Sequence, residues 1–458
     1  MSHGGAHPVD LSKVPIPRSA GDTRSVSEAL AHALVELGVR HAFGILGGAI
    51  VPFVSALGRT PVQIVNTRHE TGAVFAAMEA YFASARPALV FTTTGPGVMN
   101  ALNGVAAARW DGAKVLLVSG STPAAQRGRW AFQETSPYTF GDLGASPALF
   151  DFGTTLQDPG ELEFVVRRLA AGFARPAGFV AHVALPIDLQ ARPAKGPRSY
   201  SCSFRTTIAP DDATGDACAR ALSNEPFAIW LGFGARGAGR EVEALVARTG
   251  APVLATPRAK GIFPEDHPLF LGVSGLGGES SVARRLARYK PQRTVVLGTR
   301  LGEFSSFWRP EWVPPQGFIH VDVDPDVPGA SYPTAPTLAV HAEIGAFLRA
   351  LLARLPSAPA SSPLVSLPSP VPAEDAEQDS SAAHGVRSSV LLRAVQRVVV
   401  DGSDAIVLTE AGNAFAWCSR VLHFRSSGRY RVSTGYSSMG HSVAGVVGAA
   451  LASGKPAV

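Results

Sequence analysis

The sequence predicts an α/β fold made of doubly wound parallel sheets. Short, unbroken runs of β-branched and other apolar residues alternate along the chain with segments whose apolar residues recur at helical spacing. Strands of a parallel sheet are covered by helices on both faces, so they read as continuous apolar runs. The chain has 458 residues, which corresponds to about three domains at roughly 150 residues each.

The first predicted domain covers residues 23–190. It follows a tail, residues 1–22, that we expect to be disordered because it contains Gly, Pro, Ser and His but no apolar run. Ser25 or Ser27 is a candidate N-cap for the first helix. In chain order, we expect a helix at 25–37, strands at 42–45 and 62–66, an alanine-rich helix at 70–84, a strand at 88–94, a helix at 100–109, and strands at 114–119 and 180–189.

A second predicted domain, residues 211–353, follows a polar, proline-containing linker at 191–210. Its expected strands lie at 228–231, 253–255, 294–297 and 318–323. Residues 354–384 are dense in Pro, Ser and Ala, and this composition is typical of a linker.

A third domain is expected at residues 385–458, with a helix at 386–400 and a strand at 405–409. This segment is about half the length of an ordinary α/β domain. The apolar pair Ala457-Val458 has the character of the start of a strand, and a sheet without its later strands would have an open edge. We therefore expect this domain to be incomplete, or to be completed by another chain.

Composition excludes several classes of function. Charged residues make up 17% of the chain, the formal charge is +5, and Lys and Arg do not cluster, so we expect no nucleic-acid partner. Since no segment approaches the roughly 20 apolar residues of a spanning helix, we expect a soluble protein without a membrane role. The three cysteines, Cys202, Cys218 and Cys418, are too few and too scattered for a disulfide framework or a metal cluster. They fit a reducing cytoplasm.

Three patterns in the first domain place polar residues where ligands bind, beyond the ends of parallel strands. Glu70 stands at a strand-to-helix junction among small apolar residues, where a carboxyl group can exchange a proton with a ligand, although it also fits an ordinary first-turn acid. The glycine-rich turn at Thr92–Gly97 precedes Asn100 and a helix, as many turns in α/β proteins do. Phe132-Gln133-Glu134 lies in a loop and either binds a ligand or is solvated.

The central domain carries weaker patterns of the same kind. Gly232, Gly234 and Gly237 follow a strand and resemble a nucleotide-binding turn. Asp322 and Asp324 follow another strand, where an acid can accept a ribose hydroxyl or simply make turn contacts.

The order and spacing of these patterns resemble the acetolactate synthase type of thiamine-diphosphate enzyme over about residues 24–458. The matching stretches are Phe43–Pro52, Arg68–Glu70, Thr93–Gly104 and Phe132–Glu134 for its pyrimidine-binding domain, Lys260–His267, Gly298–Arg300 and His320–Pro325 for its central nucleotide-binding-like domain, and Thr409–Trp417 and Gly435–Gly448 for the start of its diphosphate-binding domain.

The resemblance implies roles for individual residues. Glu70 matches the glutamate that hydrogen-bonds the aminopyrimidine ring and drives it to its imino form, and Gln133, with Phe132, matches residues near the substrate. Met439 matches the bulky residue that props the cofactor in its bent shape, and the Ser437 carbonyl would face its exocyclic amine. Further cofactor contacts are implied at Gly47, Gly48, Gly412, Asn413 and Ala414.

The implied activity is a carboligase that decarboxylates a 2-keto acid such as pyruvate and joins the resulting two-carbon unit to a second carbonyl, through a carbanion at C2 of the cofactor. The alternatives are a 2-keto acid decarboxylase or an acyl transferase on the same fold, or a non-catalytic remnant that acts as the partner of a full-length relative. In this family the glutamate of one subunit faces the diphosphate domain of another, so the resemblance implies a homodimer or homotetramer.

Departures from the family pattern concern the metal and a second cofactor. The Mg²⁺ ligands are expected beyond Val458, so the sequence itself offers no metal ligand and reads as C-terminally truncated. Gly298–Glu303 lacks the family's Asp-Asp-Arg pattern, which leaves FAD as an open alternative. Glu79-Ala80-Tyr81 stands where the family has Asp-Gly-Tyr, and Ser442 and Gly445 stand where it has Gly and Pro.

Overall fold

The computed structural model describes residues 24–194, 206–223, 225–356 and 385–458. The chain forms two compact units, one made of residues up to 206 together with 440–454, the other of 207–439 together with 455–458. The predicted tail at 1–22 and most of the predicted linkers at 191–210 and 354–384 lie outside the described residues. The three-domain division of the sequence stays a prediction.

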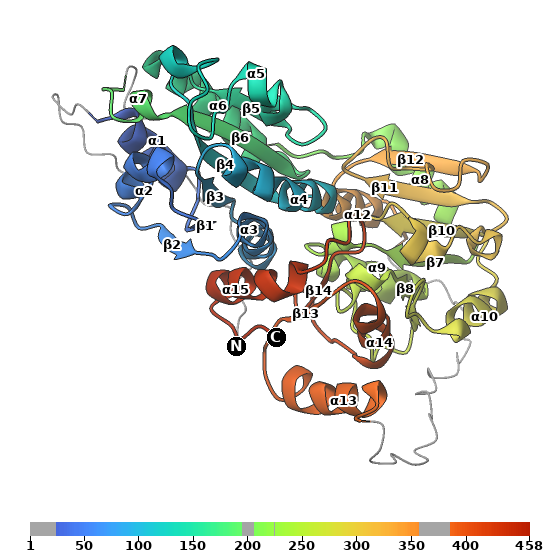
Figure 1. The fold of residues 1–458 in the computed structure, drawn as a ribbon. Helices are drawn as coiled ribbons and strands as arrows, with labels where there is room; N and C mark the ends of the chain where they lie inside the picture. The colour runs from blue at the N-terminus through green and yellow to red at the C-terminus, as the bar shows by residue number, and fades with distance from the viewer. Residues whose placement is uncertain (1–23, 195–205, 224, 357–384) are drawn as a thin grey trace. The chain divides into compact units, whose positions relative to one another are not determined.

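The first unit is built on a six-stranded sheet with the order β2-β1-β3-β4-β6-β5, in which the strands pair in parallel (Figure 1). The strands are β1 His41–Gly44, β2 Gln63–Asn66, β3 Ala88–Thr92, β4 Lys114–Ser121, β5 Phe152–Thr155 and β6 Phe179–Pro186. The residues of β3 and β6 are all buried, as expected for strands that are covered on both faces.

Helices of the first unit cover its sheet in two groups. They are α1 Val26–Glu36, α2 Val51–Leu57, α3 Glu70–Ser84, α4 Pro96–Asp111, α5 Pro137–Phe140, α6 Leu162–Phe173, α7 Ile187–Gln190 and α15 His441–Ser453. One hydrophobic cluster joins the sheet to α1, α2 and α6, and another joins it to α3 and α4. Ser25 caps α1 in a capping box with Glu28, as its sequence position predicts.

Helix α3 is buried on all sides. Its residues from Ala73 to Tyr81 are buried without interruption, which is the pattern of a helix enclosed by other elements. It lies between α4 and α15, and Figure 1 shows α15 beside it. Because α3 begins at Glu70, this packing fixes the start of the helix that carries the main candidate residue.

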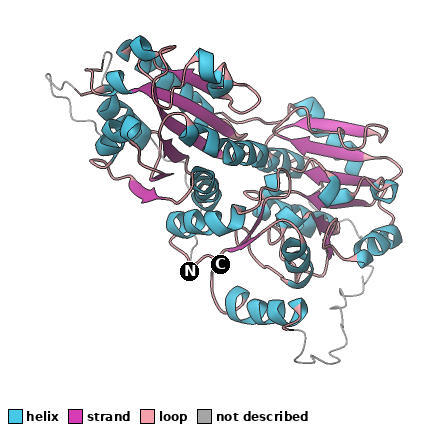
Figure 2. Cartoon of the chain, viewed as in Figure 1, coloured by secondary structure: helices cyan, strands magenta, loops and turns pink. Residues whose placement is uncertain are grey.

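The second unit contains another six-stranded parallel sheet, with the order β12-β11-β10-β7-β8-β9. Its strands are β7 Phe227–Leu231, β8 Val253–Ala255, β9 Phe270–Val273, β10 Arg293–Leu297, β11 Phe318–Asp322 and β12 Thr337–His341. Its helices are α8 Asp212–Leu222, α9 Gly239–Thr249, α10 Ser280–Tyr289, α11 Glu303–Ser306 and α12 Ile344–Leu352. Helices flank the strands of each six-stranded sheet (Figure 2).

A small third sheet belongs to the second unit. It pairs β13 Val407–Thr409 with β14 Tyr430–Val432 in parallel, next to α13 Ser388–Val395 and α14 Asn413–Val421. A parallel bridge joins Ile406 to Ala457 on the other side of β13, and the Leu408 N–H donates to the Val458 carbonyl at 2.8 Å. The predicted strand character of Ala457-Val458 agrees with this pairing.

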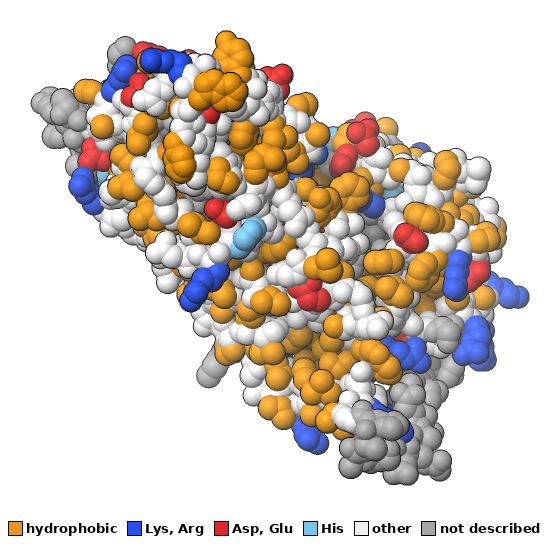
Figure 3. All heavy atoms as spheres, in the orientation of Figure 1, with side chains coloured by type: hydrophobic (Ala, Val, Ile, Leu, Met, Phe, Trp, Pro, Cys, Tyr) orange, Lys and Arg blue, Asp and Glu red, His pale blue; other side chains and the backbone are white. Residues whose placement is uncertain are grey.

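These sheets confirm the predicted α/β class with parallel strands. Within the described part of the chain, no helix is long and apolar enough to cross a membrane. On the face that Figure 3 shows, Lys and Arg side chains are scattered and hydrophobic side chains lie between them.

Candidate functional site

Glu70 is the first residue of α3 and follows the short turn after β2. His69 adopts extended backbone as the N-cap, and its Nδ1 accepts a hydrogen bond from the Thr71 N–H at 3.2 Å. The Glu70 side chain is therefore not needed as the cap. It is only 7% exposed, so the strand-to-helix junction places a carboxyl group inside the unit rather than in solvent.

The two oxygens of the Glu70 carboxyl group differ. Oε2 accepts a hydrogen bond from Asn100 Nδ2 at 3.1 Å. Oε1 has no hydrogen-bond partner among the residues that the structure describes, and a Cβ added at Gly97 would lie 3.4 Å from it. One oxygen is thus anchored by a neighbouring helix, and the other faces a glycine.

The loop that carries Gln133 is held against the glycine-rich turn. Thr94 Oγ1 donates to the Gln133 carbonyl at 2.9 Å, and a Cβ at Gly95 would lie 2.9 Å from the same oxygen. Gln133 has a φ of 53°, a left-handed conformation that is uncommon for a residue with a side chain. Neighbouring Phe132 is 87% exposed. The structure therefore brings the Gln133 backbone and the turn before α4 together.

Glu134, the last residue of that sequence pattern, has a structural role. Its Oε1 accepts the Gly128 N–H at 2.6 Å and its Oε2 accepts the Ala131 N–H at 3.2 Å. Hydrogen bonds from Ser136 and then from these backbone groups lower the pKa of Glu134.

Gly47 and Gly48 form the turn after β1, and only the first is sterically required. A Cβ at Gly47 would lie 2.5 Å from Cβ of Thr93, whereas a Cβ at Gly48 would meet nothing within 4 Å. The close approach joins this turn to the one after β3. Both turns lie at the carboxyl end of the sheet, where ligands bind in such folds.

The predicted diphosphate contacts lie in the second unit, at the start of α14. Gly412 is the N-cap with a φ of 106°, and no side chain caps this helix end. The N–H groups of Asn413 and Ala414 belong to the first turn, where backbone donors and the helix dipole favour an anion. This helix end has the chemistry that a diphosphate needs.

Ser437 and Met439 follow β14 in the same unit. Ser437 has a φ of 56°, and the Met439 side chain is 90% exposed. A long apolar side chain in this position is available for contact with a ligand ring. The predicted site residues therefore divide into a set in the first unit, around Glu70, and a set in the second unit, around Gly412.

The glycine turn after β7 does not serve as a phosphate cradle. The Gly232 N–H donates to the Leu297 carbonyl at 2.8 Å and the Gly234 N–H to the Gly298 carbonyl at 2.9 Å. A Cβ at Gly232 would lie 2.2 Å from that Gly298 oxygen. These glycines let two strand-end turns approach each other, which corrects their interpretation as a nucleotide-binding turn.

The two acids after β11 make turn contacts. Asp322 Oδ1 accepts the Asp324 N–H at 3.0 Å, and Asp324 Oδ1 accepts the Asp326 N–H at 3.1 Å. Burial raises the pKa of Asp322. The turn alternative from the sequence is therefore the observed one.

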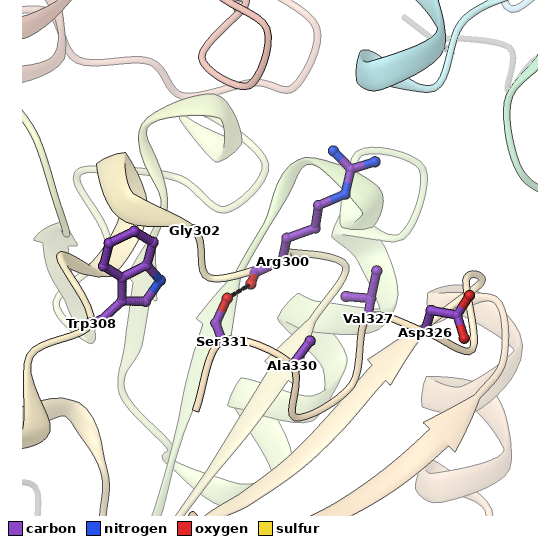
Figure 4. Close-up of a pocket in the computed structure, with 7 residues that line it drawn as sticks. All are labelled: Arg300, Gly302, Trp308, Asp326, Val327, Ala330 and Ser331. Carbon is purple, nitrogen blue, oxygen red and sulfur yellow. Dashed lines mark hydrogen bonds between the residues drawn. The ribbon is translucent and has the colours of Figure 1, made fainter. Parts of the chain in front are cut away.

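A pocket of about 700 Å³ lies beyond the ends of β10 and β11. Figure 4 shows Trp308 at one side and Asp326 at the other, with the Ser331 hydroxyl donating to the Arg300 carbonyl between them. Its lining residues are Arg300, Gly302, Trp308, Asp326, Val327, Ala330 and Ser331. Of these residues, only Arg300 and Gly302 were singled out by sequence patterns, because they lie in the stretch Gly298–Glu303.

Metal ligands do not converge in the described part of the chain, where no group of three or more His, Cys, Asp or Glu side chains is arranged to hold an ion.

Asn100 is the functional candidate that sequence reasoning left without a role. Its position four residues after Pro96 places it one turn into α4, and only the packing of α4 against α3 shows that it reaches Glu70.

Comparison with known proteins gives this geometry a family. The pattern of the thiamine pyrophosphate enzyme N-terminal TPP binding domain matches residues 24–140, and that of the thiamine pyrophosphate enzyme central domain matches residues 216–351. The chain is 27% identical to the acetolactate synthase isozyme 1 large subunit of Escherichia coli, over 93% of this chain and 74% of that protein.

Two further similarities agree. A Pseudomonas aeruginosa protein named for 2-ketoarginine decarboxylase activity is 28% identical, over 95% of this chain and 76% of its own length. A solved structure from Mycobacterium smegmatis, titled as a thiamin diphosphate-dependent enzyme, shares the fold with a TM-score of 0.79 at 21% identity, over 94% of this chain and 80% of that chain. The chain therefore belongs to the thiamine pyrophosphate enzyme family, among relatives of the acetolactate synthase large subunit.

Proposed function

We propose that this protein is a thiamine-diphosphate-dependent carboligase that decarboxylates a 2-keto acid such as pyruvate and joins the two-carbon product to a second carbonyl. The observation that carries the proposal is the buried Glu70 carboxyl group, with Oε2 anchored by Asn100 and Oε1 facing Gly97. An anchored carboxyl group with one open oxygen is suited to exchange a single proton with a bound ring.

The residues of both units fit thiamine diphosphate. Glu70 would hydrogen-bond the aminopyrimidine ring through Oε1, and the absence of a side chain at Gly97 leaves that oxygen accessible. In the second unit, the N–H groups at the start of α14 would hold the diphosphate. When bound, the cofactor supplies the nucleophile and the electron sink.

The protein's own task is to hold a proton in place and to exclude water. Glu70 is buried among protein groups, and the hydrogen bond from Asn100 restricts the orientation of its carboxyl group. Met439 would contact the ring system through its exposed side chain. Gln133, whose backbone is tied to the turn before α4, would contribute its side chain to the substrate pocket.

We also propose that the active protein is a homodimer, because the candidate residues lie on two separate compact units. A site shared between copies can be tested by mixing two inactive variants, Glu70→Gln and Gly412→Val. If each site takes one set from each copy, random mixing restores about a quarter of the activity. If each site forms within one chain, mixing restores none. Magnesium usually accompanies a bound diphosphate, but the described residues bring together no group of three or more His, Cys, Asp or Glu side chains that could hold the ion.

The direct test is calorimetric titration of the purified protein with thiamine diphosphate and Mg²⁺, followed by assay of acetolactate and acetoin from pyruvate and other 2-keto acids. Glu70→Gln should lower kcat by about 10²–10⁴-fold, the usual contribution of an acid–base group. The matched control is Glu163→Gln, which changes an exposed first-turn acid of α6. Equal, small effects of the two substitutions would show that Glu70 only favours its helix N-terminus.

A decarboxylase is the second candidate, favoured by the similarity to the Pseudomonas aeruginosa protein. Product analysis separates the two activities, because a decarboxylase releases an aldehyde and a carboligase releases an acyloin or a 2-hydroxy acid. No binding of thiamine diphosphate would favour a non-catalytic partner instead. We also propose a cytoplasmic location, and the buried free thiols of Cys218 and Cys418 support it.

A further inference from the structure

A carboxylate lies in the middle of the fully enclosed helix α3. Glu79 is 1% exposed, although its neighbours along the helix are apolar. It shares one helix face with Gly72 and Ala76, because residues spaced by four and three positions lie one above the other. A buried carboxyl group is costly unless a polar partner meets it.

The partner is His441, the first residue of α15. Its Nε2 lies 2.8 Å from Glu79 Oε1, and the histidine is 2% exposed. The ring of Phe75 packs edge-on against the imidazole, with ring centroids 5.6 Å apart and an interplanar angle of 88°. Glu79, His441 and Phe75 thus form an enclosed contact between the two helices. Glu79 and His441 are 362 positions apart in the sequence.

The rest of the contact between the two helices is made by small residues. A Cβ at Gly448 would lie 1.8 Å from the Ala76 carbonyl oxygen, and a Cβ at Gly72 would lie 3.4 Å from Cβ of Ala444. Such surfaces let the backbones approach closely, and the close approach at Gly448 already disfavours a shift that would bring Val447 or Ala449 against Ala76.

A slip of one residue would be costly at the polar contact. It would turn the His441 side chain by about 100° around the axis of α15 and leave the Glu79 carboxyl group buried without this donor. Loss of a hydrogen-bond partner by a buried polar group is costly in free energy. The buried polar pair thus adds a chemically specific constraint on register to the steric one at Gly448, as a buried Asn does in coiled coils.

We propose that Glu79 and His441 are positioning residues that fix the register of α15 on α3. In consequence, the segment that ends at Met439, two residues before His441, enters α15 in one orientation. The consequence for catalysis rests on the proposed function, in which Met439 contacts the cofactor, but the register itself does not.

Disulfide trapping tests the register without any cofactor. Cysteine at Gly72 is paired with cysteine either at Ala444, whose Cβ lies 3.4 Å from the position that a Cβ at Gly72 would take, or at Gly445, one residue further on. The first distance is close to the roughly 3.5–4.5 Å between the Cβ atoms of a disulfide, so the protein with native Glu79 and His441 should cross-link at 444 and not at 445.

The polar pair is then replaced by leucines, Glu79→Leu with His441→Leu, which makes the contact apolar at a similar side-chain volume. We expect the ratio of cross-linking at 444 to that at 445 to fall by at least about tenfold, whereas Glu79→Gln, which keeps a hydrogen-bond acceptor, should preserve it. His441→Asn, which is too short to reach Glu79, serves if the double variant does not fold. An unchanged ratio in these variants would overturn the proposal.

A separate measurement, the affinity of the protein for thiamine diphosphate with Mg²⁺, tests the link to catalysis. The leucine pair should weaken binding by about tenfold, the effect of a 1.4 kcal/mol change, while Val443→Ser on the exposed side of α15 should not. If the register shifts and affinity does not change, the pair has only a structural role. If the unaltered protein binds no thiamine diphosphate while the register result holds, the proposed function fails and the register assignment stands.

Discussion

His320 gives the second unit a stability that depends on pH. The histidine is 2% exposed. Its Nδ1 accepts the Gly329 N–H at 3.3 Å and its Nε2 lies 2.8 Å from the Thr299 carbonyl oxygen. A backbone donor on one nitrogen and a carbonyl on the other specify a neutral ring with its proton on Nε2. Protonation of Nδ1 would break the first hydrogen bond and charge a buried group.

The size of the effect follows from the pKa. Burial lowers the pKa of His320 from 6.5 to about 4. Because the folded pKa lies below the unfolded one, the unfolded state binds more protons between these values, and stability is lost as pH falls through this window. The full loss is about 3 kcal/mol, and about 2 kcal/mol of it falls between about pH 7.5 and about pH 5.

Urea unfolding followed by tryptophan fluorescence measures this loss in the unit that contains His320. Trp230 and Trp312 are buried there, with tilted rings whose centroids lie 5.2 Å apart, so their emission reports on this core. The variant His320→Asn keeps an acceptor near the Gly329 N–H but cannot be protonated in this range. The unaltered protein should lose about 2 kcal/mol more than this variant between the two pH values.

The matched control is His341→Asn, on the adjacent strand β12, where the side chain is exposed. It should leave the pH dependence of the unaltered protein in place. Equal losses of unfolding free energy in the unaltered protein and in His320→Asn would refute the argument, because the buried neutral ring would then contribute nothing to the proton balance.

Three further changes test the packing. Lys260→Met should destabilise the second unit by about 3–5 kcal/mol in chemical denaturation, because it leaves Glu265 without its lysine partner. The two charged groups lie 2.8 Å apart and both side chains are 1% exposed. Adding Glu265→Gln should recover part of the loss. Gly448→Ala should lower the free energy of unfolding by about 1–3 kcal/mol, because the new Cβ would overlap the α3 backbone. In the control Gly237→Ala, the new Cβ would meet nothing within 4 Å, so calorimetry should show no loss of stability. Ser25→Ala should cost about 1 kcal/mol by removing the cap of α1, and no loss in thermal unfolding would contradict the capping geometry.

Local sequence patterns predicted the elements well where local physics decides them. The helix predicted at 70–84 is α3 with the same bounds, and the strand predicted at 253–255 is β8. Boundaries moved where proline intervenes. Helix α4 begins at Pro96 rather than at 100, since proline is favoured in the first helical turn, and β6 ends at Pro186 rather than at 189.

The sequence identified individual candidate residues of the site, but it did not predict the contacts between them. Glu70 was identified from its junction and from the family resemblance, and the structure shows it buried. Its hydrogen bond from Asn100 joins two helices whose packing no local pattern encodes. The glycines after β7 were misinterpreted because a glycine that allows two backbones to touch looks, in sequence, like one that admits a phosphate.

Sequence patterns were sufficient for the α/β class, for many of its strands and helices, and for the identity of the residues available for chemistry, because hydrophobic periodicity and turn chemistry act over a few neighbouring residues. They missed short elements such as β5 and β9. The packing of α15 on α3, the contact of His441 with Glu79, and the anchoring of one Glu70 oxygen while the other stays open became visible in the three-dimensional fold alone. These are contacts between segments far apart in the chain, and they depend on which buried surfaces fit together.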